Sequence, residues 1–272
     1  MLQIDSTITI ADGVEIPRVG LGVYQSRRGS ETSSAVQAAL QAGYRHVDTA
    51  QIYGNEADVG AALRDSGLDR SEVFVTSKLW NDNFHRAADA FEHSLQRVGL
   101  DYLDLFLLHW PVSGRRIEAY RELEALVQTE QLRAIGVSNF TVRHLEELME
   151  STSIVPAVNQ VELSPYLQQT ELVAFCRDAK IELQAYSPLT RGQRLTDPAL
   201  VAVADQVERT PAQVLIRWSL QKGFIVLPKS VTASRIVENG AVFDFELDDA
   251  QMSALDELEE GLRLSWDPTL VP

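Results

Sequence analysis

Short apolar runs alternate with segments of helical period along almost the whole chain of 272 residues. The apolar runs, in order, are PRVGLGVY, YRHVDTA, VFVTSKLW, YLDLFLLHW, LRAIGVSNF, AVNQVEL, IELQAYSPL and FIVLPKS. Segments such as SETSSAVQAALQAG, AADAFEHSLQRVG and TELVAFCRDAK lie between them and carry apolar residues at helical spacing. Strands that are apolar nearly throughout and alternate with helices are typical of a parallel sheet buried on both faces.

Eight strand–helix units in about 250 residues match the size of a (β/α)8 barrel. We therefore predict an α/β fold, a (β/α)8 TIM barrel with short extra helices and an N-terminal β-hairpin in TITIADGVEI that turns at Asp12-Gly13. No Pro-, Gly- or Ser-rich linker divides the chain, so a single barrel domain is expected over residues 1–272. A doubly wound sheet is the alternative, but GLGVYQ offers Gly20 and Gly22 without the third glycine of a dinucleotide fingerprint.

Composition and charge narrow the class of protein. The chain is 45% hydrophobic, which is enough for one large core, and its formal net charge is −15. Nucleic acid and anionic membranes both favour clustered Lys and Arg, so this charge disfavours them as partners. The one cysteine, Cys176, excludes an internal disulfide and fits a reducing compartment. The start MLQIDSTITI lacks the features of a secretory signal, and no apolar stretch approaches ~20 residues. We expect a cytoplasmic monomer with no membrane partner and no nucleic-acid partner.

Polar residues end seven consecutive predicted strands. These residues are Asp48, Lys78, His109, Ser138-Asn139, Gln160, Tyr186-Ser187 and Lys229-Ser230. Because barrel enzymes place their chemistry at the C-terminal ends of the strands, this pattern predicts a site there. Asp48 needs a partner, since an unpaired buried carboxylate is costly, and Lys78 on the adjacent strand is the expected one. A helix cap is the ordinary alternative for Asp48, but Asn55 stands immediately before an amphipathic run and is better placed to cap it.

Seven motifs, in order along the chain, resemble those of the aldo-keto reductase family. They are GYRHVDTAQIYGNE, TSKLW, LDLFLLHWP, AIGVSNF, NQVELSPY, AYSPL and LPKS…RIVEN, and the resemblance runs from about residue 7 to residue 261. The short connection after His109 and the short C-terminal tail look most like the bacterial members, such as the diketogluconate reductases. The resemblance implies that a small-molecule aldehyde or ketone is reduced to an alcohol by hydride transfer, with NADP(H) as the cofactor. No metal is expected, because the five histidines do not form an HExxH pattern.

By this resemblance, the family's four catalytic residues correspond to Asp48, Tyr53, Lys78 and His109. Tyr53 would be the general acid that protonates the alkoxide, and the Lys78 ammonium would lower its phenol pKa from about 10. Asp48 would keep Lys78 charged and in place, while His109 would donate a hydrogen bond to the carbonyl. Taken singly, each has an ordinary alternative: a cap for Asp48, wall packing for Tyr53, a solvated cation for Lys78 and a satisfied strand-end histidine for His109.

The resemblance also implies a site for the nicotinamide cofactor. Its residues here are Ser138, Asn139, Gln160, Tyr186, Ser187, Leu189, Lys229, Ser230, Arg235, Glu238 and Asn239. The hydroxyl and amide groups of Ser138, Asn139 and Gln160 suit the nicotinamide carboxamide, and Tyr186 would stack on the ring. As alternatives, Ser138 or Asn139 would cap the helix TVRHLEELME and Gln160 would be structural.

Charge in the stretch from Lys222 to Arg235 predicts the cofactor preference. This stretch has three basic residues and no acid, whereas DFELDDAQMSALDELEE has eight acidic residues and no base. Lys229, Ser230 and Arg235 would face one anion beside a helix N-terminus, where the family holds the adenosine 2′-phosphate. Without a bound anion, two cations at the start of a helix would be slightly unfavourable because of the helix dipole. A bound phosphate is the better explanation for them, so NADPH is expected to be preferred over NADH.

The expected substrate wall is apolar and consists of Tyr24, Ile52, Trp80 and Trp110, although aromatic residues at strand ends often belong to the core. Trp266, in the short tail RLSWDPTLVP, would lie either over this pocket or away from it. Arg115 and Arg116 would either favour an acidic substrate or simply be solvated. Thr190 stands where the family usually has glycine, in the loop expected to pass over the pyrophosphate, and its β-branched side chain restricts φ there.

Two rival functions remain compatible with a barrel. In a Schiff-base lyase, Lys78 would attack a carbonyl as a neutral amine, but Asp48 beside it favours the charged form. In a nicotinamide-binding regulatory protein without activity, the expected mark is loss of Tyr53 or His109, and both are present.

Overall fold

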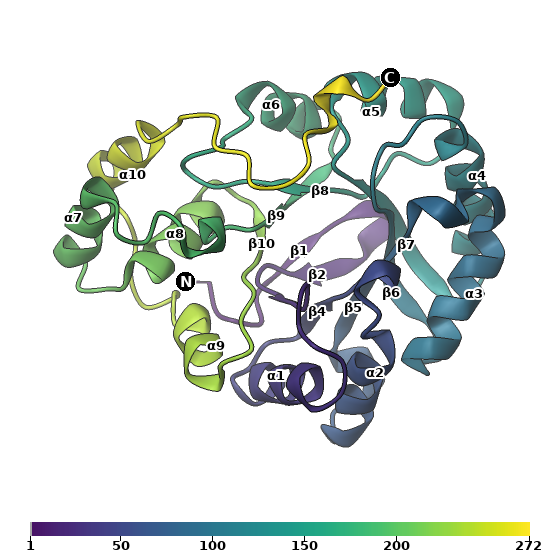
Figure 1. The fold of residues 1–272 in the computed structure, drawn as a ribbon, viewed down its shortest axis with the longest axis horizontal. Coiled ribbons are helices and arrows are strands. Elements are labelled where there is room, and N and C mark those ends of the chain that lie inside the picture. The colour runs from purple at the N-terminus through teal and green to yellow at the C-terminus, as the bar shows by residue number, and fades with distance from the viewer. Residues whose placement is uncertain (1) are drawn as a thin grey trace.

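Eight parallel strands form a closed ring in the computed structural model, which describes residues 2–272 (Figure 1). The strands are β3 (Leu21–Gly22), β4 (His46–Asp48), β5 (Phe74–Leu79), β6 (Leu103–Leu108), β7 (Leu132–Ser138), β8 (Val158–Glu162), β9 (Glu182–Tyr186) and β10 (Ile225–Leu227). Each strand pairs in parallel with the next, from β3 to β10. Parallel bridges then join Val19 to Val226 and Gly22 to Lys229. The predicted (β/α)8 barrel is confirmed, and the doubly wound alternative is wrong because the first strand also meets the last.

A helix follows every barrel strand and covers the outside of the ring (Figure 1). These helices are α1 (Ser30–Gln41), α2 (Glu56–Asp65), α3 (Ala87–Val98), α4 (Arg116–Val127), α5 (Val142–Ser151), α6 (Thr170–Asp178), α8 (Pro211–Gln221) and α9 (Ala233–Gly240). The expected extra helices are α7 (Pro198–Gln206) and α10 (Asp249–Asp256). Strands enclosed in this way are largely apolar. All six residues of β6 are buried, including Asp104, which pairs with Arg70 and Arg133. Within residues 2–272, none of the helices combines the length and the apolar character that crossing a membrane requires.

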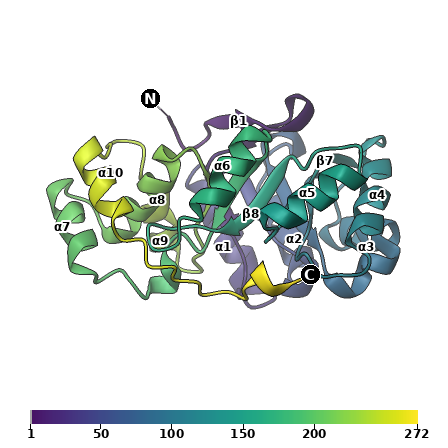
Figure 2. The same ribbon diagram turned by 90° about the horizontal axis from the view of Figure 1, so that it is seen from above.

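The predicted hairpin closes one end of the barrel. β1 (Thr7–Thr9) pairs antiparallel with β2 (Glu15–Pro17), and the chain turns between them where Gly13 takes a φ of 78°. Its apolar side chains pack against barrel residues that include Phe74 and Val158, the first residues of β5 and β8. Figure 2 shows the hairpin on the side opposite the yellow C-terminal tail. The C-terminal ends of the strands are therefore the open end of the barrel.

Asn55 stands at the N-cap of α2, as expected, but its side chain does not cap the helix. Its Nδ2 donates a hydrogen bond to Val23 O at 3.0 Å, and its Oδ1 accepts one from Thr49 Oγ1 at 2.8 Å. The capping prediction is wrong because this buried amide is used by partners on other loops. Its bonds connect the loop after β3 to the loop after β4, which carries Tyr53.

Cys176 lies on α6 and belongs to the buried core. Burial raises the pKa of its thiol to about 12. Because the thiolate is the reactive form of cysteine, this thiol is inert near neutral pH.

Candidate active site

The carboxylate of Asp48 has the partner that the sequence predicts. Asp48 is the last residue of β4, and Lys78 lies on the neighbouring strand β5. Lys78 Nζ is 2.6 Å from Asp48 Oδ1 and also donates a hydrogen bond to Thr49 O at 2.9 Å. The Lys78 side chain is 0% exposed and that of Asp48 is 5% exposed. A buried ion pair therefore stands at the C-terminal end of the barrel.

Tyr53 and His109 lie beside this pair. Tyr53 ends a short 3-10 helix, Gln51–Tyr53, and its Oη is 3.4 Å from Lys78 Nζ. His109 follows β6, and its ring meets the Tyr53 ring edge-on, with 5.7 Å between the centroids. The structure thus brings together the four side chains that the sequence singles out as catalytic.

Burial decides the protonation of these groups. It raises the pKa of Tyr53 well above the usual value, and the negative charge of Asp48 raises it further. The pKa of Tyr53 is therefore raised rather than lowered, because desolvation of a buried phenolate is the largest effect. Burial lowers the pKa of His109 well below its usual value, and the charge of Lys78 acts in the same direction. Near pH 7, Tyr53 is a protonated phenol and His109 a neutral imidazole.

Gln160 is a second partner of Asp48. Its Nε2 donates hydrogen bonds to Asp48 Oδ2 and to Gln184 Oε1, each at 2.8 Å. Its amide nitrogen is thus already engaged, so only the oxygen remains for a ligand. Sequence reasoning missed Gln184, although a glutamine in the middle of the apolar strand β9 was a signal that a polar partner lies inside the barrel.

A hydrogen-bonded chain connects the ends of β6, β7 and β9. Tyr186 Oη donates to Asn139 Oδ1 at 2.8 Å, and Asn139 Nδ2 donates to His109 O at 3.1 Å and to Ser138 Oγ at 3.0 Å. The capping alternative for Ser138 and Asn139 is wrong, because Thr141 is the N-cap of α5. Both side chains therefore belong to the barrel mouth rather than to the helix.

Two cations stand near the end of β10 without an acidic partner. Lys229 and Arg235 are exposed, and neither takes part in an ion pair within residues 2–272. Ser230 lies next to Lys229, and its Oγ accepts a hydrogen bond from Thr232 N at 3.1 Å. Thr232 is the N-cap of α9, which places Arg235 in the first turn of that helix. In a chain of net charge −15, this leaves a local cationic surface.

The expected substrate wall surrounds the mouth. Tyr24 and Ile52 are large apolar residues that are 47% and 49% exposed, while Trp80 and Trp110 are half-buried. Trp266 packs on Trp110 with 4.8 Å between the ring centroids, so the tail brings this side chain to the pocket. Exposed apolar side chains gathered in one place are typical of a ligand site.

The tail is fixed there by Glu162, which sequence reasoning missed. Glu162 is the last residue of β8 and is buried, and its carboxylate accepts hydrogen bonds from Leu264 N at 2.9 Å and Ser265 N at 3.0 Å. As with Asp48, an acidic residue at the end of a buried strand was the feature of the sequence that could have pointed to Glu162.

Known proteins resemble this chain in sequence and in fold. The family model described as "Aldo/keto reductase family" matches residues 18–260. The chain belongs to the aldo/keto reductase family. It is similar to the glyoxal reductase of Bacillus subtilis (strain 168), with 45% identity over 268 residues, 98% of this chain and 97% of that protein. It is also similar to the methylglyoxal reductase DkgA of Escherichia coli (strain K12), with 42% identity over 267 residues and 97% of each chain covered. A Bombyx mori aldo-keto reductase solved in complex with NADP superimposes with a TM-score of 0.89 at 34% identity, covering 97% of this chain and 95% of that one.

As a member of this family, the protein is an oxidoreductase that acts on carbonyl groups. Its four predicted catalytic side chains lie together at the open end of the barrel, where barrel enzymes place their chemistry.

The loop at Thr190, where the resemblance implied a glycine, takes the left-handed conformation that glycine favours. Thr190 has a φ of 50°, and Ser187 and Arg191 have φ values of 50° and 51°. Thr190 N donates a hydrogen bond to Ser187 O at 2.9 Å, which closes the turn. A threonine in the left-handed region is strained, so this loop stores strain at Thr190. Leu189, between them, is half-buried against the core.

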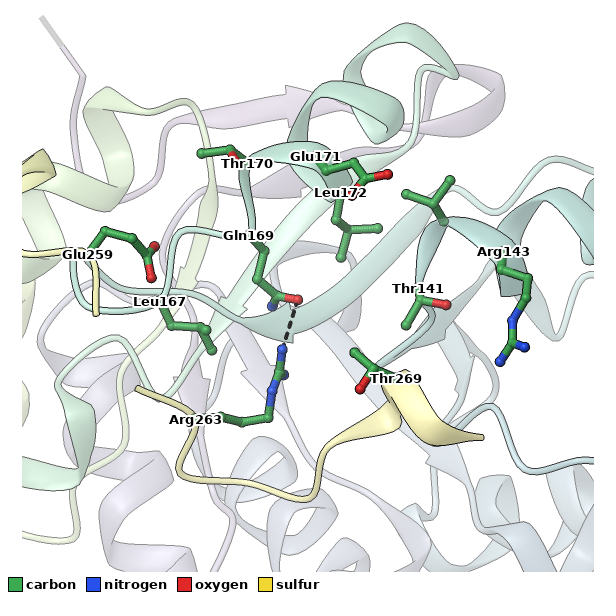
Figure 3. Close-up of a pocket in the computed structure, with 11 residues that line it drawn as sticks. Thr141, Arg143, Leu167, Gln169, Thr170, Glu171, Leu172, Glu259, Arg263 and Thr269 are labelled. Carbon is green, nitrogen blue, oxygen red and sulfur yellow. Dashed lines mark hydrogen bonds between the residues drawn. The ribbon is translucent and has the colours of Figure 1, made fainter. Parts of the chain in front are cut away.

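A separate groove lies outside the site, between the tail and the starts of α5 and α6 (Figure 3). Its volume is about 610 Å³. Arg263 of the tail points into it and donates a hydrogen bond to Gln169 Oε1 at 3.2 Å. None of the side chains that the sequence singles out lines it, so the groove marks where the tail is attached and not where the chemistry occurs.

Arg116 is not available to an acidic substrate. It is buried, donates hydrogen bonds to Pro111 O at 2.8 Å and Pro272 O at 2.6 Å, and pairs with Glu147. Its guanidinium therefore holds the end of the tail on the barrel. Arg115 is exposed at the N-cap of α4, as the solvated alternative expects.

Proposed function

We propose that this aldo-keto reductase reduces an aldehyde or ketone to an alcohol with NADPH, and that Tyr53 is the general acid. The observation that carries the proposal is the 3.4 Å distance from Tyr53 Oη to Lys78 Nζ, because that lysine is itself paired with Asp48. When bound, the reduced nicotinamide supplies the hydride. The chain's own residues must then hold the carbonyl and deliver a proton to its oxygen.

Tyr53 suits the role of proton donor in the reducing direction. A carbonyl that accepts hydride becomes an alkoxide, and the raised pKa of Tyr53 means that the phenol still carries its proton near neutral pH. Once the proton has left, the ammonium of Lys78 stabilises the phenolate that remains. Asp48 supports this step by keeping Lys78 charged. Burial lowers the pKa of Lys78, and the carboxylate of Asp48 opposes that lowering.

His109 suits the role of orienting the carbonyl. Because its imidazole is neutral, it has one N–H to donate and brings no second positive charge next to Lys78. Its ring is held between Tyr53 and Trp80, with centroid distances of 5.7 and 5.4 Å. A carbonyl oxygen held by both His109 and Tyr53 would be placed at the proton that it receives.

The residues around the mouth fit a nicotinamide cofactor that carries a 2′-phosphate. Tyr186 offers a ring held by its bond to Asn139, against which a nicotinamide ring would stack. Lys229 and Arg235 offer two cations without acidic partners in the described chain, beside the start of α9. The NADP in the Bombyx mori structure supports the same choice of cofactor.

The substrate that we propose is a small aldehyde, including 2-oxoaldehydes. The names of the similar glyoxal and methylglyoxal reductases support this class. The aromatic wall of Trp80, Trp110 and Trp266 would also accept larger apolar aldehydes.

The proposal is tested by replacing Tyr53 with Phe. Tyr53→Phe should depress NADPH-dependent reduction of methylglyoxal by ~10²–10⁴-fold, because the proton donor is lost. Affinity for NADPH, followed by quenching of tryptophan fluorescence, should stay close to that of the wild type. Tyr24→Phe makes the same chemical change at the pocket wall and should leave turnover within a few-fold of the wild type. Near-wild-type turnover by Tyr53→Phe would refute the assignment.

A further inference from the structure

A second cleft opens directly beside the proposed substrate pocket. Its volume is about 480 Å³, and it is lined by Arg28, Gln51, Ile52, Gly54, Trp80, Asn83 and Arg97. It shares Ile52 and Trp80 with the expected substrate wall, and Ile52 and Gly54 are the chain neighbours of Tyr53. The cleft therefore shares a wall with the expected substrate pocket, next to the loop that carries Tyr53.

Arg28 is the available charge in the cleft. It is exposed, and within residues 2–272 no ion pair or side-chain hydrogen bond engages its guanidinium. Its neighbour Arg27 is different, since it pairs with Glu31 at 2.7 Å. Arg97, the other arginine of the cleft, is bound by Glu56 at 2.6 Å. A cation without an acid beside it is notable in a chain with 39 acidic and 24 basic residues, and it raises the local affinity for an anion.

Gly54 allows Arg28 to lie close to the catalytic loop. A Cβ built on Gly54 would be 2.1 Å from Arg28 Nη2 and 2.7 Å from Arg28 Nε. Any other residue at position 54 would push the guanidinium away, and the φ of 68° at Gly54 disfavours other residues as well. The guanidinium thus lies against the backbone of the residue that follows Tyr53.

The loop that carries Arg28 is fixed relative to Tyr53. Asn55 Nδ2 donates hydrogen bonds to Val23 O at 3.0 Å and to Ser26 O at 3.4 Å, which joins the loop after β3 to the start of α2. Gln51 fixes the opposite wall, because its Oε1 accepts hydrogen bonds from Trp80 N at 2.9 Å and Asn83 Nδ2 at 3.0 Å. The amides of Gln51 and Asn83 are thereby used within the protein, so Arg28 is left as the group that a ligand would meet.

We propose that this cleft is a specificity subsite for a carboxylate on the substrate, with Arg28 as its charge partner. The inference rests on the proposed reductase function and extends it to carbonyl compounds that carry a carboxylate several bonds from the reacting carbon. Guanidinium binds carboxylate through two parallel N–H bonds, which fixes orientation as well as charge. The carboxylate would lie on Arg28 while the flat face of Trp80 covers the linking carbons. Arg28 is a positioning residue for this substrate class and takes no part in the proton transfer.

The test compares two substrates that differ in one charge: 4-carboxybenzaldehyde and its neutral methyl ester. For the wild type, kcat/KM should be higher for the acid than for the ester. Arg28→Ala should lower kcat/KM for the acid by about tenfold, mainly through KM, and should leave the ester within twofold, because one charged contact is lost and the chemistry is untouched. Arg28→Lys should recover part of the preference, and added salt should weaken it in the wild type.

Arg27→Ala is the matched control, because it removes the same charge at the neighbouring position. The Arg27 side chain is already paired with Glu31. It should leave the ratio of the two substrates unchanged. If Arg28→Ala alters both substrates equally or neither, or if Arg27→Ala has the same effect, the subsite is refuted while the reductase function stands. If the wild type oxidises NADPH with neither these substrates nor methylglyoxal, the proposed function fails and the subsite fails with it.

Discussion

At the scale of single residues, the site is organised around the buried carboxylate of Asp48. One of its oxygens pairs with Lys78 and the other accepts from Gln160, so both oxygens are engaged. Burying two charges is costly, and removing only one leaves the other uncompensated in the interior. The pair therefore serves stability and catalysis at once, and the two contributions can be separated by experiment.

Lys78→Met should abolish reductase activity and lower the free energy of unfolding by ~3–5 kcal/mol, because Asp48 would remain charged and unpaired. The double variant Asp48→Asn with Lys78→Met should recover most of that stability, since a neutral amide needs no cation, but should stay inactive. Urea unfolding curves and NADPH turnover measure the two effects. Activity that returns together with stability in the double variant would contradict a direct role for Lys78.

At the scale of elements, the strand ends position nearly everything that the site uses. Asp48 ends β4, Ser138 ends β7 and Tyr186 ends β9, while Lys229 follows β10. The apolar runs predicted every barrel strand because enclosed strands are largely apolar, and the polar residues at the ends of seven of these strands predicted the site.

What local sequence could not show was how side chains from distant elements use one another. Asn55 looked like a helix cap but is engaged by Val23 and Thr49. Gln184 suggested a polar partner inside the barrel, but only the structure identifies that partner as Gln160. The raised pKa of Tyr53 has the same origin, since burial depends on the packed barrel and not on the neighbours in the chain. The left-handed turn at Thr190 is a further case, because threonine gives no sign of the conformation that the loop imposes.

The segment from β10 to α9 carries the prediction on cofactor choice. Arg235→Ala should weaken NADPH binding by ~1–3 kcal/mol, the range for hydrogen bonds to charged groups, with little effect on NADH. Fluorescence titration of both cofactors measures this difference. Arg177→Ala, which removes an exposed arginine from α6, should change neither affinity. An equal loss for NADPH and NADH in Arg235→Ala would show that this arginine does not read the 2′-phosphate.

At the scale of the whole molecule, the hairpin closes one end of the barrel and the tail crosses the other (Figure 2). The wall between them is tightly filled, and it holds a histidine in its interior. His46 is fully buried, with its Nε2 3.1 Å from Thr76 Oγ1. Burial lowers the pKa of His46 to about 3. Folding therefore holds this group neutral at pH values where the unfolded chain would protonate it.

The consequence is a defined loss of stability in acid. The folded pKa of about 3 lies below the unfolded value near 6.5, so the unfolded state gains the proton first and stability falls as pH drops below about 6.5. His46→Asn removes this group, so the stability advantage of the wild type over the variant should shrink by about 2 kcal/mol between pH 7.5 and pH 5. Urea unfolding at the two pH values measures it. His85→Asn, which makes the same change at an exposed histidine, is the matched control.

Because Cys176 lies in the core, the protein is well suited to site-directed labelling for spectroscopy. Its single native sulfhydryl is sealed inside the barrel wall and protonated, so maleimide reagents have no thiolate to attack while the fold is intact. A cysteine introduced at the half-exposed Ile52 would then accept one fluorophore or spin label per molecule, at the rim of the pocket. Such a probe would report arrival and departure of ligands without any need to engineer out a background signal.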